Sequence, residues 1–151
     1  MTITEINLIT FSPTHTSKQI GEAIVRGMGI ADVSFVDMTL QAPEKKEFGS
    51  DALAVITVPV YGGHVAPLAL ERMKDLRADG TPAVIVVVYG NRAYEKALVE
   101  LDAFVSGLGF KVIAGGTFVG EHSYSSDRYP IAAGRPDDDD LKFAEEFGAK
   151  V

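Results

Sequence analysis

Four hydroxyl side chains lie close together near the N-terminus, between an apolar segment and a segment with helical spacing; they are Ser12, Thr14, Thr16 and Ser17. The N-terminus of a helix presents unpaired N–H groups and a partial positive charge, which together bind an anion. One hydroxyl would be enough to cap such a helix. The additional hydroxyls favour a ligand with several oxygens at its end, such as a phosphate monoester, and they predict a phosphate-binding loop at residues 12–17.

This segment does not contain the glycines of the common nucleotide-binding loops. Dinucleotide-binding folds use G-x-G-x-x-G, because the pyrophosphate must approach the backbone closely. Walker A loops use G-x-x-x-x-G-K-[ST] to surround the phosphates of a nucleotide. Since the first glycine of the chain is Gly21, we expect neither an NAD-type nor an NTP-type site.

Polar and aromatic residues are concentrated in three further segments, each directly after an apolar run: PVYGGHVAP at 59–67, GNRAY at 90–94 and GEHSYS at 120–125. All three histidines of the chain fall in these segments or in the hydroxyl-rich one, as His15, His64 and His122. In an open parallel sheet, ligands bind beyond the carboxyl ends of the strands. We therefore expect the four segments to meet at one edge of a sheet and to form one site.

The elements that must position these segments alternate between apolar runs and amphipathic stretches. We expect strands at residues 3–11, 33–36, 53–58, 83–89 and 110–119. We expect helices at residues 17–28, 67–77, 94–108 and 138–147. Continuous apolar strands are typical of a parallel sheet that is covered on both faces. The alternation therefore predicts a doubly wound α/β sheet in a single domain that spans residues 1–151.

Composition limits the function classes. A chain of 151 residues that is 46% hydrophobic can bury a core as one globular domain. A net charge of −7 disfavours nucleic acid as a partner and favours a basic protein. The absence of cysteine excludes disulfides and thiolate-held Fe–S clusters within these residues. No apolar run is long enough to span a membrane and no signal-peptide pattern is present, so we expect a cytoplasmic protein.

The acidic run at residues 137–140 raises the question of a metal site. Consecutive carboxylates on a helix point in different directions and do not converge on one cation. The run follows Pro136, and carboxylates at a helix N-terminus complement the helix dipole and cap free N–H groups. We therefore interpret this run as the start of a helix.

Five segments in this order, FSPTHTSK, VPVYGGHVAP, VYGNRAYEKAL, GEHSYS and IAAGRP, resemble the flavodoxin family. The resemblance is nearest to the flavodoxin-type domain that is fused to a bacterial ferredoxin-like module with two Fe–S clusters, and it extends over nearly the whole chain. It implies a three-layer, doubly wound flavodoxin-like fold with a five-stranded parallel sheet in the order 2-1-3-4-5. It also implies FMN as the cofactor and electron transfer as the function.

The resemblance assigns the FMN-binding residues to four segments. The phosphate would be held by Ser12, Thr14, His15, Thr16 and Ser17. The isoalloxazine ring would be clamped by Pro59, Val60, Tyr61, Gly62, Gly63 and His64 and by Tyr89, Gly90, Asn91, Arg92 and Tyr94. Tyr61 and Tyr94 are expected to lie against the faces of the ring, each contributing about 1 kcal/mol beyond burial. The remaining wall would be formed by Glu121, His122 and Ser123, and no catalytic residue or metal ligand is expected.

The chain departs from the family pattern at two histidines. His15 stands where the phosphate loop usually has glycine, so it either adopts the loop conformation and pairs with phosphate or weakens binding. His64 stands where a basic residue, often arginine, is common. It either titrates near neutral pH beside the flavin or is an ordinary exposed loop residue.

An electron carrier is the preferred function, with another redox protein, such as a ferredoxin-like Fe–S module, as its partner. The alternative is an FMN-dependent reductase of a quinone-like or other small acceptor, but no segment marks a nicotinamide site. A non-redox metal protein is disfavoured, because histidines on three separate loops need supporting residues to converge. A receiver domain is excluded because Pro59 stands where the phospho-accepting aspartate would follow the strand, and no G-x-S-x-G motif indicates a hydrolase.

Overall fold

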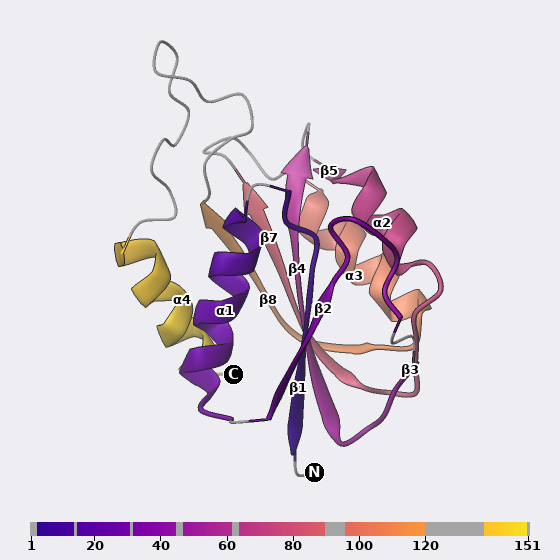
Figure 1. Ribbon diagram of the computed structural model, residues 1–151, viewed down its shortest axis with the longest axis horizontal. Helices are drawn as coiled ribbons and strands as arrows, with labels where there is room; N and C mark the ends of the chain where they lie inside the picture. The colour runs from indigo at the N-terminus through magenta and orange to yellow at the C-terminus, as the bar shows by residue number, and fades with distance from the viewer. Residues whose placement is uncertain are drawn as a thin grey trace.

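Five parallel strands form the centre of the protein in a computed structural model, which describes residues 3–13, 15–30, 32–44, 47–61, 64–89, 96–119 and 138–150 (Figure 1). These strands are β1 (Glu5–Thr10), β2 (Val33–Asp37), β4 (Ala52–Tyr61), β7 (Pro82–Tyr89) and β8 (Lys111–Val119). They lie in the order β2-β1-β4-β7-β8, and each neighbouring pair is parallel. Counted along the chain without the two-residue strands, this is the predicted order 2-1-3-4-5.

Within the described residues, four helices cover the sheet: α1 (Thr16–Met28), α2 (Pro67–Met73), α3 (Ala97–Gly107) and α4 (Asp138–Lys150). Helices α1 and α4 lie on one face, and α2 and α3 lie on the other (Figure 1). Side chains alternate between the faces of a strand, so Leu8 packs in the cluster under α1 while Ile9 packs in the cluster under α2 and α3. Burial on both faces explains the continuous apolar runs and confirms the three-layer architecture.

The predicted helix at 67–77 is too long. Helix α2 ends at Met73, Leu76 is buried, and the next residues form β6 (Arg77–Ala78), which pairs with β3 (Glu47–Phe48) in a separate two-stranded sheet. A further short strand, β5 (His64–Val65), runs antiparallel to the end of β4. Strands of two residues are too short to produce a periodic pattern in the sequence, so none of the three was predicted.

Helix α4 begins at Asp138, as the acidic run predicts, while Asp137 lies outside the described residues. In the described part of the chain, no three histidine or acidic residues are arranged to hold a metal ion. None of the described helices is both long and apolar enough to cross a membrane.

Glycines bring α1 and α4 into close contact. A Cβ atom added at Gly27 of α1 would overlap the carbonyl oxygen of Glu145, and one added at Gly148 of α4 would overlap the carbonyl oxygen of Ile24. An ion pair of 3.2 Å between Arg26 Nε and Glu145 Oε1 lies beside this contact. The contact fixes α1, whose first residues belong to the hydroxyl-rich segment.

Candidate functional site

The hydroxyl-rich segment follows β1, at the point where β1 and its neighbour β4 connect to helices on opposite faces of the sheet. Strand β1 lies between β2 and β4, and it ends at Thr10 opposite Thr57 of β4. From β1 the chain passes to α1 on one face, whereas from β4 it passes to α2 on the other face (Figure 1). Ligands of open α/β sheets bind at such a switch point, beyond the carboxyl ends of the strands. The predicted phosphate loop is therefore at the expected position in the fold.

Ser12 holds the loop in position through hydrogen bonds of both its backbone and its side chain. Its backbone N–H donates to Oγ1 of Thr39 at 3.0 Å, and its own Oγ accepts the backbone N–H of Lys18 in the first turn of α1 at 3.0 Å. The side chain is buried. Because a hydroxyl can donate one hydrogen bond while it accepts another, the Ser12 proton remains available as a donor to a ligand.

His15 holds the backbone in the left-handed region immediately before α1. Its φ is 66° and its ψ is −1°, and it is the one non-glycine residue with positive φ in the part of the chain that the structure describes. Its N–H donates to the carbonyl of Ser12, and its carbonyl accepts the N–H of Gln19. Glycine is the residue that adopts this conformation without strain. The backbone thus explains why a glycine was expected here, and the loop conformation is adopted with histidine in its place.

A fully buried hydroxyl lies in the first turn of α1. Ser17 is the second residue of the helix, and its Oγ has no hydrogen-bond partner among the described residues; the same is true of Oγ1 of Thr57 on β4. One turn after Ser17, Gly21 approaches Thr57 so closely that an added Cβ would lie 3.2 Å from its Oγ1. A buried polar group without a partner costs about 1–3 kcal/mol. Ser17 thus offers a buried hydroxyl that has no partner among the described residues, at the end of a helix that favours anions.

Asp37, the last residue of β2, places a negative charge near this loop. The hydrogen bond from the Thr39 side chain is the largest cause that lowers the pKa of the Asp37 carboxyl below its ordinary value, and the Thr39 N–H, 2.9 Å from Oδ1, adds to the effect. The charges of Lys18 and His15 lower this pKa further. Asp37 is thus ionised at neutral pH, with the cationic Lys18 side chain near it.

The end of β4 forms the second part of the site. Tyr61, 40% exposed, pairs with His64 of β5, and Gly62 and Gly63 between them lie outside the described residues. Glu100 of α3 holds β5 with both carboxylate oxygens: Oε1 accepts the N–H of Val65 at 2.8 Å, and Oε2 lies 3.3 Å from Nδ1 of His64. The side chain of His64 is about half-exposed, and its ring contacts Glu100 of α3.

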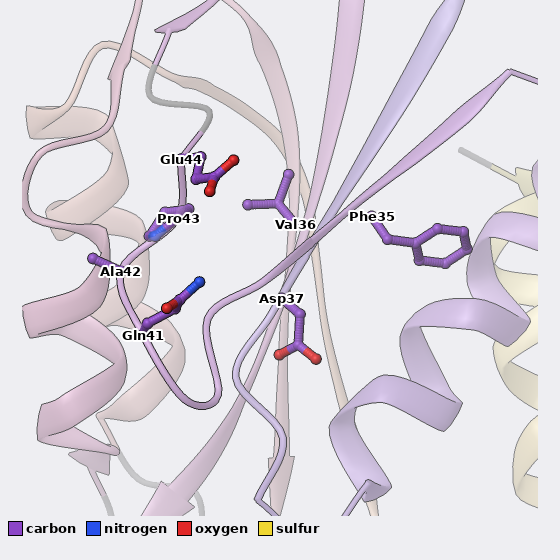
Figure 2. Close-up of a pocket in the computed structure, with 7 residues that line it drawn as sticks. All are labelled: Phe35, Val36, Asp37, Gln41, Ala42, Pro43 and Glu44. Atoms are coloured by element: carbon purple, nitrogen blue, oxygen red, sulfur yellow. The ribbon is translucent and has the colours of Figure 1, made fainter.

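A cleft of about 280 Å³ lies beside β2 (Figure 2). Its wall is formed by Val36 and Asp37 of β2 and by Gln41, Pro43 and Glu44 of the segment that follows. Figure 2 shows Val36 directed toward this segment, whereas the side chain of Phe35 points away from it. Asp37 thus lines this cleft and also accepts the N–H of Thr39, whose side chain contacts the hydroxyl-rich segment.

The described candidate residues all lie at the carboxyl edge of the sheet: Ser12, His15, Thr16, Ser17, Pro59, Val60, Tyr61, His64 and Tyr89. The other candidates lie outside the described residues: Thr14, Gly62, Gly63, Gly90, Asn91, Arg92, Tyr94, Glu121, His122 and Ser123. Asp37, Thr39 and Glu100 were not expected. The available signals were two polar residues just after the predicted strand at 33–36 and an acidic residue in the second turn of the predicted helix at 94–108, but neither signal identifies a partner.

A scan of the sequence against protein-family profiles finds no match, and a search of curated protein sequences finds none either. Solved structures do match. The two-electron reduced flavodoxin of Megasphaera elsdenii has a TM-score of 0.61 and 16% identity, over 97% of this chain and 99% of that chain. A flavoprotein of Lactobacillus acidophilus in complex with FMN has a TM-score of 0.53 and 15% identity, over 76% of this chain and 93% of that chain.

A flavone reductase has a TM-score of 0.66 and 11% identity, over 97% of this chain and 61% of that chain. At such low identities the likeness shows the fold alone. The chain therefore has a flavodoxin-like α/β fold.

Proposed function

We propose that this chain binds FMN, with the phosphate at residues 12–17, and serves as an electron-transfer protein. The observation that carries the proposal is the Ser17 hydroxyl, which is fully buried in the first turn of α1 and has no partner among the described residues. A phosphate oxygen at the switch point would satisfy this donor and complement the helix dipole. The FMN named for the similar flavoprotein of L. acidophilus is consistent with such a ligand.

The residues of the loop fit a phosphate monoester. Ser12 keeps a hydroxyl proton to donate while its oxygen accepts from Lys18. The left-handed backbone at His15 turns the chain into α1, so that Thr16 and Ser17 lie in the first helical turn. No glycine-rich segment is needed, because a terminal phosphate approaches the end of the loop rather than its middle.

The end of β4 is the proposed ring site. Tyr61 is partly exposed at this edge and offers an aromatic face. The residues of the ring site that lie outside the described part, namely Gly62, Gly63, Gly90, Asn91, Arg92, Tyr94, Glu121, His122 and Ser123, belong to the proposal as the resemblance assigns them. Bound FMN supplies the redox chemistry, and the chain's own residues hold its phosphate, cover the ring and set the charge around it.

The proposed partner is another redox protein in the cytoplasm. The chain contains no cysteine, so a partner Fe–S cluster would be held outside these residues. A ferredoxin-like module, as in the fusion proteins that the sequence resembles, is the proposed type. The charge of −7 favours a partner with a basic docking face.

A reductase of a small acceptor is the second candidate function. It is favoured by the likeness to the flavone reductase, although this chain matches only 61% of that protein. Potentiometric titration separates the two functions, because a carrier is expected to take up electrons in two distinct one-electron steps. Rapid turnover of quinone or flavone by the FMN-loaded protein would instead favour the reductase.

The test of FMN binding compares FMN with riboflavin, which lacks the phosphate. We expect FMN to bind far more tightly, as measured by quenching of flavin fluorescence. Ser17→Ala is expected to weaken FMN binding about 10- to 100-fold, since a hydrogen bond to a charged group contributes about 1.5–3 kcal/mol, and to leave riboflavin binding unchanged. The same substitution removes an unpartnered buried hydroxyl, so the apoprotein is expected to be equally or more stable. Equal affinity for FMN and riboflavin in the unmodified protein would refute the proposal.

A further inference from the structure

A chain of hydrogen bonds joins the end of β2 to the first turn of α1. Asp37 Oδ1 accepts the backbone N–H of Thr39 at 2.9 Å. Thr39 Oγ1 accepts the backbone N–H of Ser12 at 3.0 Å. Ser12 Oγ in turn accepts the backbone N–H of Lys18 at 3.0 Å. Thr39 is thus connected to the proposed phosphate loop although it belongs to a different part of the chain.

The direction of each bond determines what Ser12 can offer a ligand. Thr39 Oγ1 accepts the Ser12 N–H, while the Thr39 backbone N–H donates to the Asp37 carboxylate, so Asp37 holds the residue that holds Ser12. The Ser12 peptide is thereby held in the orientation in which its side-chain oxygen accepts the Lys18 N–H, and a hydroxyl that accepts one hydrogen bond can still donate another.

The bond between Thr39 and Ser12 is not required to hold β1 and β2 together. These strands pair over five residues, from Ile6 opposite Val33 to Thr10 opposite Asp37. The next residue is also tied down, because the Met38 N–H donates to the Thr10 carbonyl at 2.8 Å. Removal of the Thr39 hydroxyl is therefore expected to release the loop and to leave the sheet intact.

We propose that Thr39, oriented by Asp37, is a positioning residue for the phosphate end of the ligand. It acts through Ser12 and does not contact the ligand itself. Its role is to keep the loop in the conformation that distinguishes a phosphorylated ligand from the unphosphorylated one. This inference rests on the proposed FMN function and adds a residue that selects for the phosphate.

The charge of Asp37 is compatible with an anion in the loop. The cationic Lys18 side chain, in the first turn of α1, lies near enough for its charge to act on the Asp37 carboxylate. The carboxylate thereby orients Thr39 without leaving an uncompensated negative charge beside the phosphate.

The test compares Thr39→Val with Thr39→Ser, because valine keeps the shape of threonine without the hydroxyl and serine keeps the hydroxyl. We expect Thr39→Val to weaken FMN binding about tenfold, with riboflavin binding unchanged within about twofold. In the apoprotein, the amide hydrogen of Ser12 is expected to exchange faster with solvent. Thr39→Ser is expected to retain the affinity for FMN and the slow exchange. If the valine variant does not fold, Thr39→Ala replaces it.

Thr81→Val is the matched control. Thr81 is a buried threonine directly before β7, at the amino ends of the strands and so at the end of the sheet opposite the proposed site. Its Oγ1 donates to the carbonyls of Phe48 and Gly49. This variant is expected to lower the thermal midpoint without changing the ratio of FMN to riboflavin affinity. If Thr39→Val behaves like Thr81→Val, or binds FMN as tightly as the unmodified protein does, the assignment of Thr39 is wrong. If the unmodified protein shows no preference for FMN over riboflavin, the proposed function fails, and the assignment of Thr39 fails with it.

Discussion

At the scale of single residues, the loop before α1 depends on one unfavourable backbone conformation. His15 has a φ of 66°, and a left-handed conformation costs a residue with a Cβ atom roughly 1–2 kcal/mol. Histidine tolerates this region better than β-branched residues do. The strain lies where the ligand is proposed to bind, which is where strained residues are commonly found.

Substitutions at His15 are expected to follow this backbone preference. His15→Gly should give an apoprotein at least as stable as the unmodified one, because glycine adopts positive φ without strain. His15→Val should lower the free energy of unfolding by about 1–2 kcal/mol. Urea denaturation measures both, and equal stability of the glycine and valine variants would contradict the left-handed conformation.

Asp37 is expected to contribute to the pH dependence of stability. Its pKa is lower in the folded protein than the ordinary value of 3.8, so its ionised form stabilises the fold above that value. The contribution is lost as the pH falls through the lower, folded pKa. Asp37→Asn should therefore be less stable than the unmodified protein at pH 7, and the difference should shrink below about pH 4.

Thermal unfolding of both proteins across pH 2.5–7 measures this difference. The carboxylate is largely exposed, so the effect is expected to be small in salt. A difference in stability that stays constant over this whole range would show that the charge of Asp37 has no part in it.

At the scale of elements, Glu100 connects α3 to β5, the short strand that pairs with the end of β4. It accepts the N–H of Val65 and lies beside His64. Glu100→Ala is expected to lower the free energy of unfolding by about 1 kcal/mol and to speed exchange of the Val65 amide hydrogen. Glu100→Gln keeps an oxygen that accepts the Val65 N–H, so it should retain most of the protection.

Glu145→Ala is the control for this prediction. Glu145 forms an ion pair with Arg26 in which both side chains are about half-exposed, and such pairs contribute about 0.5 kcal/mol. The control is expected to leave Val65 exchange unchanged. A Glu100→Ala variant with a protected Val65 amide would contradict the role of Glu100.

At the scale of the whole molecule, the helical layer on one face depends on two glycines. Gly27→Ala or Gly148→Ala would push a methyl group into a backbone carbonyl of the opposite helix. Either substitution would force α1 and α4 apart, and it should therefore lower the free energy of unfolding by about 1–3 kcal/mol. Gly107→Ala is the control, because an added Cβ there has no atom within 4 Å, and alanine favours the helix. Calorimetry of the three variants measures these effects, and equal midpoints would contradict the close contact.

The sequence by itself determined the class of architecture, because both of its signals are local. Apolar runs such as residues 83–89 have no polar face and therefore indicate a strand buried on both sides. The alternation of such runs with amphipathic stretches then predicts a doubly wound sheet. Four hydroxyls before a helix likewise indicate an anion site, because the dipole and the free N–H groups belong to any helix N-terminus.

Only the tertiary structure decided which residue of that site does what. Ser12 and Thr39 are 27 residues apart and meet because β1 and β2 pair in one register. Val65 and Glu100 are 35 residues apart and meet because α3 packs beside β5. The end of α2 at Met73 was decided by the pairing of Arg77–Ala78 with Glu47–Phe48. The sequence does not determine which group a hydroxyl will bond to. Packing placed the Ser12 hydroxyl where it accepts the Lys18 N–H, and it buried the Ser17 hydroxyl without a hydrogen-bond partner among the described residues.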